Sequence, residues 1–404
     1  MIGVIHGGKM ILRDINKRIC VIIMALCLGI IALSGCGSES PAGENEIEIP
    51  WEDGSDLSVA EEAMKEVAGE DGTLKEEAKE NGNAGQAGDT DVPEAADTPA
   101  QAAVPEWDGD FEAFWIAYWD GEDYIKKLQD RGYGADIFCM FEAMFDGEYK
   151  LYLEDSVKEQ YDAVKAKAKD KKYYLTFVND VVTETGSEQK DTDVLYAVLK
   201  DPAGHAGDVV KLAKDNGFDG VEIDYEKIRK DLGLWDLFIA FENELIKQAS
   251  DAGLEVRIVL ESSTPVSQIS LPKGPEYVVM CYNLYGYGTE PGPKADRGFL
   301  EDIVRDFDPL SDNLGYAFAN GGFDWNLTKD GITALSDREA KELIIKHQGD
   351  GPERDMESGV VKFTYEEKGE KHEVWVADDA TIQFWADVIA VSSGKKVRVS
   401  LWRV

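Results

Sequence analysis

Eight apolar, strand-like runs separated by helical patterns constrain the fold of this chain more than any other feature. They follow one another from residue 107 to the C-terminus. Stretches with the 3.6-residue period of amphipathic helices lie between most of them, as crossovers between parallel strands require. Eight such units in about three hundred residues are typical of a (β/α)8 barrel. The runs are AFWIAYW, ADIFCMF, YYLTFVN, GVEIDYE, EVRIVLE, YVVMCYN, NLGYAFA and VRVSLW.

Two connections depart from the simple repeat. The segment SSTPVSQIS is too short for a full helix. The long connection before the final strand contains a helical pattern and the stretch VVKFTYEEKGEKHEVWVA, which predicts a hairpin with a Gly in its turn. We therefore expect an α/β fold over residues 106–404, a (β/α)8 TIM barrel with a small α+β insertion before the last strand.

The N-terminus has the pattern of a secretory signal. Basic residues precede the apolar run ICVIIMALCLGIIALSG, which is too short to be read best as a permanent membrane span. The residues Leu33-Ser34-Gly35-Cys36 resemble the lipobox of bacterial lipoproteins, which implies cleavage after residues 1–35 and lipidation of Cys36. An uncleaved membrane anchor is the alternative. In both cases the chain is extracytoplasmic, and the lipobox predicts a lipid anchor in the bacterial cell membrane.

Residues 36–105 predict a disordered acidic linker. They are rich in Glu, Asp, Ala and Gly and carry almost no large apolar residue after Trp51, so they bury too little surface to offset the entropy of ordering. The whole chain has a formal net charge of −38 at pH 7, which argues against nucleic acid as a partner.

Cysteine usage points to no metal site. Beyond Cys36 only Cys139 and Cys281 remain, each inside an apolar strand-like run, so we expect two buried thiols and no disulfide. No Cys or His has metal-ligand spacing, and we expect neither a metal nor another cofactor. We expect a monomer.

The stretch DGVEIDYE places carboxylates at every second position. Because strand side chains alternate faces, Glu222, Asp224 and Glu226 share one face. A solvated edge strand would show the same alternation. Here, however, the run is the fourth of eight, and Glu226 falls at its C-terminal end, where the active sites of such barrels lie.

These residues resemble glycoside hydrolase family 18, the chitinase-like enzymes, whose fourth strand carries D-G-x-D-x-D-x-E. The resemblance extends to MCYN as the sixth-strand M-x-Y-D and to VSLWRV as an eighth strand ending with Trp. NLGYAFANGGFDW and HEVWVADDATIQFWADVI are similar to segments of bacterial members related to spore-germination hydrolases. The resemblance covers about residues 107–404.

The resemblance implies substrate-assisted retaining catalysis, in which the 2-acetamido oxygen of the sugar attacks the anomeric carbon. It implies that Glu226 is the general acid and base, and that Asp224 orients the acetamide and offsets its developing positive charge. It also implies that Glu222, which replaces the family Asp, shares a proton with Asp224.

The resemblance assigns the remaining site residues as well. Tyr282 would hydrogen-bond the acetamide, and Asn283 stands where many members have Asp. Trp402 would form the floor beneath the reacting sugar. Met280 and Asp219 complete the matched motifs and are assigned to substrate binding with Asn283 and Trp402. Taken singly, Tyr282 and Trp402 are more typical of barrel core, but their places at the ends of the sixth and eighth strands, in register with Glu226, favour the ligand role.

The function expected from this resemblance is hydrolysis of β-glycosidic bonds next to N-acetylhexosamine. The N-acetylglucosamine-containing partner could be peptidoglycan, a chitin-type oligomer or the core of an N-glycan. The alternative is a catalytically weak or inactive glycan-binding lipoprotein of the same fold, which the departures at Glu222 and Asn283 leave open.

Overall fold

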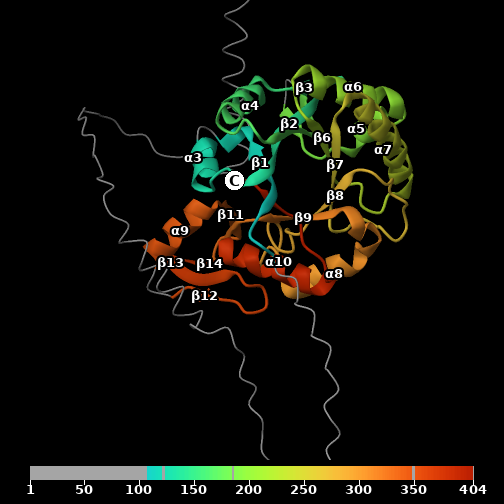
Figure 1. The fold of residues 1–404 in the computed structure, drawn as a ribbon. Helices are drawn as coiled ribbons and strands as arrows, with labels where there is room; N and C mark the ends of the chain where they lie inside the picture. Colours follow the sequence, from blue (N-terminus) through green and yellow to red (C-terminus); the bar gives the residue numbers. More distant parts are fainter. Residues whose placement is uncertain (1–106, 121–122, 184–185, 348–350, 404) are drawn as a thin grey trace, which may run out of the picture. The chain divides into compact units, whose positions relative to one another are not determined.

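Eight parallel strands close into a barrel in the computed structural model, which describes residues 107–120, 123–183, 186–347 and 351–403 (Figure 1). Each strand pairs in parallel with two neighbours, and the pairing of β2 with β4 completes the ring. The expected (β/α)8 barrel and its eight expected strands are confirmed. The barrel strands are β1 (Phe111–Ala117), β2 (Ala135–Asp146), β4 (Lys172–Thr183), β6 (Gly220–Asp224), β7 (Glu255–Leu260), β8 (Glu276–Met280), β9 (Leu314–Ala319) and β15 (Val399–Trp402).

Helices connect most of these strands. Several begin at an aspartate, as with Asp201, Asp231 and Asp296, whose side chains accept hydrogen bonds from the backbone of the first turn. Residues 261–275, between β7 and β8, contain no helix, as expected. The helices of the barrel are α3 (Asp123–Asp130), α4 (Asp155–Lys167), α5 (Thr192–Val198), α6 (Pro202–Asp215), α7 (Leu232–Ala252), α8 (Arg297–Asp306) and α10 (Asp379–Ser393), with the 3-10 turns η1 (Tyr118–Asp120) and η2 (Asp308–Asn313).

Two hydrophobic clusters occupy the two faces of the barrel sheet. The larger one lies between strands and helices and includes Val221 and Ile223 of β6 and Tyr225, which follows it. The smaller one fills the barrel interior and includes Trp115 and Cys139. The cysteines Cys139 and Cys281 are both buried and free, as expected. Period-two alternation along each strand therefore decides which side chains reach the interior.

The strands β2 and β4 run beyond the barrel at their C-terminal ends. Each is twelve residues long, and each continues into a short antiparallel pairing, with β3 (Leu151–Leu153) and β5 (Gly186–Glu188) respectively. The loop that follows β5 turns back toward the end of β6. It is held against β4 by the backbone N–H of Asp191, which donates to the carbonyl of Asn179.

The expected α+β insertion lies between β9 and α10 and forms a five-stranded antiparallel sheet with one helix (Figure 1). The expected hairpin is present, with its turn at Lys368 and Gly369, which both have positive φ. Gly322 permits the close pairing of β10 with β14, because a Cβ there would lie 1.8 Å from the Trp375 carbonyl oxygen. The elements are β10 (Gly321–Asn326), β11 (Gly331–Leu335), α9 (Asp337–Lys346), β12 (Glu353–Arg354), β13 (Val361–Glu367) and β14 (Glu370–Ala377).

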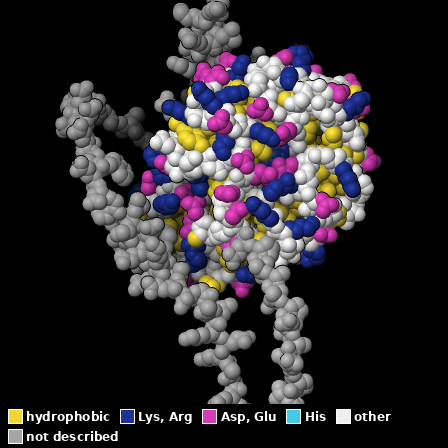
Figure 2. All heavy atoms as spheres, viewed as in Figure 1, with side chains coloured by type: hydrophobic (Ala, Val, Ile, Leu, Met, Phe, Trp, Pro, Cys, Tyr) yellow, Lys and Arg dark blue, Asp and Glu magenta, His cyan; other side chains and the backbone are white. Residues whose placement is uncertain are grey.

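The expected signal peptide, Cys36 and the acidic linker lie outside the described residues. Within those residues, none of the helices has the length and apolar character needed to span a membrane. Figure 2 shows acidic and basic side chains interspersed over one face of the folded part of the chain.

Candidate active site

The alternating carboxylates of Glu222 and Asp224 in β6, and of Glu226 just beyond it, turn into the barrel. Their neighbours Val221, Ile223 and Tyr225 belong to the cluster beneath the helices, so the opposite face of the strand must look inward. Glu222 is fully buried and Asp224 is 7% exposed. The side chain of Glu226, two residues beyond the end of β6, is 14% exposed. The exposure increases toward the C-terminal mouth of the barrel, where a substrate would enter.

Glu222 is held by partners other than Asp224. Its carboxylate accepts hydrogen bonds from Trp115 Nε1 and from Thr176 Oγ1 at 2.7 Å, and it forms an ion pair with Arg257 Nη1 at 2.6 Å. Arg257 is also fully buried and faces Glu222 directly across the β6–β7 pairing. Among the described residues, no hydrogen bond joins Glu222 to Asp224. The expected proton sharing is therefore replaced by an ion pair to a residue that sequence reasoning missed.

Asp224 has a polar atom that the fold leaves without a partner. Its Oδ1 is buried and makes no hydrogen bond to any described residue. Burial, and then the nearby carboxylates of Glu226 and Glu222, raise the pKa of Asp224 well above its ordinary value. A buried carboxyl group without a partner is costly, so its retention favours a functional role at this position.

Glu226 is positioned through its backbone by Asn179, a fully buried residue of β4. The Asn179 amide oxygen accepts the Glu226 N–H at 2.9 Å, and the Asn179 amide nitrogen donates to the Glu226 carbonyl at 3.1 Å. The Glu226 carboxylate forms an ion pair with Lys190, in the loop after β5. The sequence assigned no role to Asn179 or Lys190, because both contacts join segments that are far apart in the chain.

Further carboxyl groups surround Glu226. They were not assigned from the sequence, because a single acid near the end of a strand forms no recognisable motif. Glu142 of β2 is 5% exposed, and burial, followed by the charge of Asp180, raises its pKa well above the ordinary value. Burial likewise raises the pKa of Asp180, at the end of β4. Burial and then the charge of Glu226 raise the pKa of Glu261, which follows β7. Burial thus raises the pKa of several acids that line the mouth.

Aromatic side chains line the side of the mouth formed by β15, β1 and β2. Trp402 is half-buried, and its ring centroid lies 4.8 Å from Phe141 and 6.0 Å from Trp115, both in edge-on geometry. Trp119 extends the row from Phe141, at 5.5 Å, and is 42% exposed. The row leads from the barrel interior to solvent and offers apolar faces to a sugar.

The sixth-strand motif reaches the same interior. Met280 ends β8 and is buried in the interior cluster, against which Tyr282 packs. Burial, and then the charge of Asp224, raise the pKa of Tyr282 well above its ordinary value, so its hydroxyl keeps its proton. Asn283 is exposed and has φ of +80°, a conformation that Asn tolerates better than most residues.

Asp219 lies at the wrong end of β6 for the role assigned to it. It precedes the strand and is exposed, and its Oδ2 accepts the backbone N–H of Tyr173, near the start of β4, at 3.0 Å. Glu226 lies seven positions further along the chain, a span of about 23 Å when extended. Its assignment to substrate binding is wrong, and its contacts are structural.

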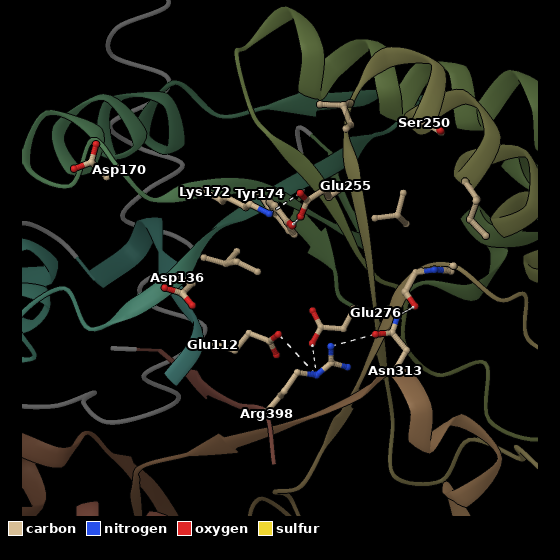
Figure 3. Close-up of a pocket in the computed structure, with 16 residues that line it drawn as sticks. Glu112, Asp136, Asp170, Lys172, Tyr174, Ser250, Glu255, Glu276, Asn313 and Arg398 are labelled. Atoms are coloured by element: carbon tan, nitrogen blue, oxygen red, sulfur yellow. Dashed lines mark hydrogen bonds and ion pairs between the residues drawn. The ribbon is translucent and has the colours of Figure 1, made fainter. Parts of the chain in front are cut away.

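A cavity of about 720 Å³ opens at the opposite, N-terminal end of the barrel (Figure 3). Figure 3 shows Glu112, Glu276 and Arg398 converging there, with Arg398 Nε 3.8 Å from each carboxylate. Burial and the neighbouring Glu276 raise the pKa of Glu112 to about 8. These residues lie near the starts of their strands, so the cavity is separate from the mouth that holds Glu226.

The described residues contain no cluster of three or more His, Cys, Asp or Glu side chains able to hold a metal ion.

The barrel and the position of its carboxylates define a class of protein, the (β/α)8 barrels with an acidic fourth strand. Solved structures of this class match the chain. A chitinase from Chromobacterium violaceum matches with a TM-score of 0.59 and 16% identity, over 72% of this chain and 94% of that one. The spore cortex-lytic enzyme SleL of Bacillus megaterium matches with a TM-score of 0.59 and 19% identity, over 72% and 70%. At these identities the likeness shows the fold.

One curated protein is similar in sequence. The uncharacterized glycosylase YvbX of Bacillus subtilis is 27% identical over 190 residues, which are 43% of this chain. The match spans about half of that protein, 54% of its length. No protein-family model matches the chain.

Proposed function

We propose that the protein is a retaining glycoside hydrolase that cleaves β-glycosidic bonds next to N-acetylhexosamine, with the acetamido group of the substrate as nucleophile. The observation that carries this proposal is the pair Asp224 and Glu226, aligned on the inner face of β6 with a buried, unpartnered oxygen on Asp224. A substrate acetamide N–H is a donor that would satisfy this oxygen. A second protein nucleophile is not required.

Glu226 acts first as an acid and then as a base. The acetamido oxygen attacks the anomeric carbon, the bond to the leaving oxygen breaks, and Glu226 gives that oxygen its proton. Glu226, now a carboxylate, takes a proton from water, whose oxygen attacks the same carbon and reopens the acetamido ring. Two inversions at one carbon retain its configuration. Asp224 orients the acetamide and stabilises the positive charge of the cyclic intermediate.

Other residues of the mouth would bind the sugar. Trp402 presents a half-buried ring at the end of β15, suited to stacking beneath a pyranose. The protonated hydroxyl of Tyr282 is a donor for the acetamide oxygen. Met280 fills the adjoining interior, and Asn283 contributes an exposed amide at the rim.

The names of the similar proteins support a glycan substrate. The curated relative is described as a glycosylase, and the structural neighbours include chitinases and spore cortex-lytic enzymes. A Cycas revoluta chitinase of similar fold was solved with an N-acetylglucosamine trimer. From these names we infer for this chain only that its substrate contains an N-acetylated sugar. Peptidoglycan, chitin-type oligomers and N-glycan cores all contain one.

A glycan-binding protein of weak or no activity is the second candidate. The ion pair of Lys190 with Glu226 is the observation that favours it, because a carboxylate paired with an ammonium group carries no proton to donate. Such a protein would bind one of these glycans and release no product.

Product analysis separates the two functions. The full chain is incubated with peptidoglycan, a chitin oligomer and an N-glycoprotein, and new reducing ends are counted while NMR follows the anomeric configuration. A hydrolase of the proposed class releases β-configured products from at least one substrate, and a thiazoline analogue of N-acetylglucosamine inhibits it competitively. Binding without release would identify the second candidate.

We also propose that the protein is a lipoprotein outside the bacterial cell membrane. The support is the sequence Leu33-Ser34-Gly35-Cys36 after an apolar signal-like run. Cys36→Ala should leave unprocessed precursor and abolish lipid labelling in cells. A variant that is cut and labelled like the wild type would exclude lipidation at this cysteine.

A further inference from the structure

Backbone hydrogen bonds fix the loop that carries Lys190 at the mouth of the barrel. Its backbone N–H donates to Asp180 Oδ1 at 2.8 Å, and the next residue, Asp191, is hydrogen-bonded to Asn179 through both its N–H and its carbonyl. Asn179 also clamps the Glu226 backbone. The ammonium group of Lys190 and the carboxylate of Glu226 are therefore held together by one shared anchor, unlike a typical surface ion pair.

Three basic residues in the loop after β5 and the segment after β6 have left-handed backbone conformations. Their φ angles are +57° for Lys190, +63° for Lys227 and +51° for Arg229. Such conformations cost on the order of 1 kcal/mol or more for residues other than Gly, and strain of this kind gathers at functional sites. Lys227 Nζ donates to the carbonyl of Gln189 and so ties the segment after β6 to the Lys190 loop.

Acidic and basic groups meet at this rim, and Lys190 is the basic group paired with Glu226. Burial raises the pKa values of Glu142, Asp180, Asp224 and Glu261. Burial is the largest single influence on Lys190 and opposes its charged form. The charge and hydrogen bond of Glu226, together with the charges of Asp224 and Glu261, outweigh it and raise the pKa of Lys190. Lys190 keeps 39% of its side chain exposed, so a ligand can reach it.

We propose that Lys190 is a specificity-determining residue that is released from Glu226 by a carboxylate on the substrate, on the leaving side of the scissile bond. In the free protein the ion pair withholds Glu226 from acid catalysis. A substrate carboxylate takes over the ammonium group, and Glu226 is free to hold the proton that it donates. The preferred substrates are N-acetylhexosamine glycans whose neighbouring sugar is acidic, and neutral glycans react slowly. This inference rests on the proposed hydrolytic function.

The test compares two substrates that differ only in charge. One is a tetrasaccharide of alternating N-acetylglucosamine and N-acetylmuramic acid, whose lactyl groups carry carboxylates. The other is the same tetrasaccharide with these carboxylates converted to primary amides. The full-length wild type should hydrolyse the acidic form with a kcat/KM about tenfold or more above that of the amide, the size expected for a charge-assisted contact.

Variants assign this preference to one side chain. Lys190→Met should bring the ratio of the two kcat/KM values close to one, and Lys190→Arg should keep most of it. Lys172→Met is the matched control, because Lys172 also pairs with a glutamate, Glu255, but at the opposite end of the barrel. Its ratio should equal that of the wild type. Melting temperatures establish that each variant is folded.

Two results overturn the inference and can be told apart. If the wild type cleaves both forms and Lys190→Met leaves their ratio unchanged, the hydrolytic function stands and Lys190 has no part in specificity. If the wild type cleaves neither form and no other N-acetylhexosamine glycan, the proposed function fails and the role of Lys190 fails with it.

Discussion

Asn179 grips the backbone of Glu226 on both sides of the residue, with hydrogen bonds of 2.9 and 3.1 Å that join the end of β4 to the segment after β6. These contacts place the carboxylate of Glu226 without touching it. A buried side chain on a neighbouring strand thus determines the geometry of the proposed acid.

Asn179→Ala should lower kcat more than stability alone explains. The variant leaves two part-buried backbone groups of Glu226 and the Asp191 carbonyl without this partner, at up to about 1–3 kcal/mol each, and lets the carboxylate shift. We expect kcat to fall by about tenfold or more. The control is Asn216→Ala, which removes an amide bonded to the Leu212 carbonyl at the end of α6. A variant with reduced stability and unchanged kcat would show that Asn179 does not position the acid.

Asp224→Asn should abolish most hydrolysis while glycan binding persists. An amide can still hydrogen-bond the acetamide but offers no negative charge to the developing cyclic cation, so we expect kcat to fall by about a hundredfold or more. Single-turnover kinetics and glycan binding by calorimetry separate the two effects. Equal rates for variant and wild type would remove Asp224 from the mechanism.

The expected effect of Glu222→Asp differs between the sequence resemblance and the structure. Restoring the family residue should be neutral or favourable by resemblance alone. In the structure, shortening the side chain draws the carboxylate away from Trp115 and Arg257, leaving a buried guanidinium group with less compensation. We expect a loss of about 3 kcal/mol in the free energy of unfolding, measured in urea. A variant of full stability and higher rate would favour the family geometry instead.

Glu242→Met should change how stability depends on pH. Glu242 is fully buried in α7, neither carboxylate oxygen has a described partner, and burial raises its pKa well above 4.5. At a pH between the ordinary pKa of the unfolded state and the raised pKa of the folded state, the folded state keeps the proton and the unfolded state releases it. The stability therefore falls as pH rises, by up to about 1.4 kcal/mol per pH unit.

The Glu242→Met variant should lose this slope and gain about 1–3 kcal/mol at pH 8, as judged by urea unfolding at pH 5 and 8. Asp236→Asn, on the exposed side of the same helix, should behave like the wild type. Parallel pH profiles for Glu242→Met and the wild type would mean that this carboxyl group is ionised in the folded state.

The barrel and the inward face of β6 were predictable because both depend on local periodicity. Alternation along DGVEIDYE assigns Glu222, Asp224 and Glu226 to one face whatever the neighbouring strands are. The hairpin of the insertion was predictable from a single Gly in its turn. The order of DGVEIDYE already places Asp219 and Glu226 at opposite ends of the strand, so the assignment of Asp219 to substrate binding followed the motif and overlooked the strand geometry.

Contacts across strands could not be predicted in this way. Arg257 meets Glu222 only through the register of β6 with β7, and Lys190 meets Glu226 only because β4 extends into β5 and turns back. Both pairs join residues about 35 positions apart. Their contacts depend on tertiary geometry, which leaves no periodic trace in the sequence.

Glu226→Gln tests the central claim most directly. Glutamine keeps the shape of the side chain and most of its hydrogen bonds but supplies no proton, so hydrolysis of an N-acetylhexosamine glycan should fall by about a hundredfold or more with binding retained. The measurement is kcat/KM for the purified full chain and the variant, on whichever glycan the wild type cleaves. A rate equal to that of the wild type would contradict the account, because the acid would then lie elsewhere and the carboxylates of β6 would be structural.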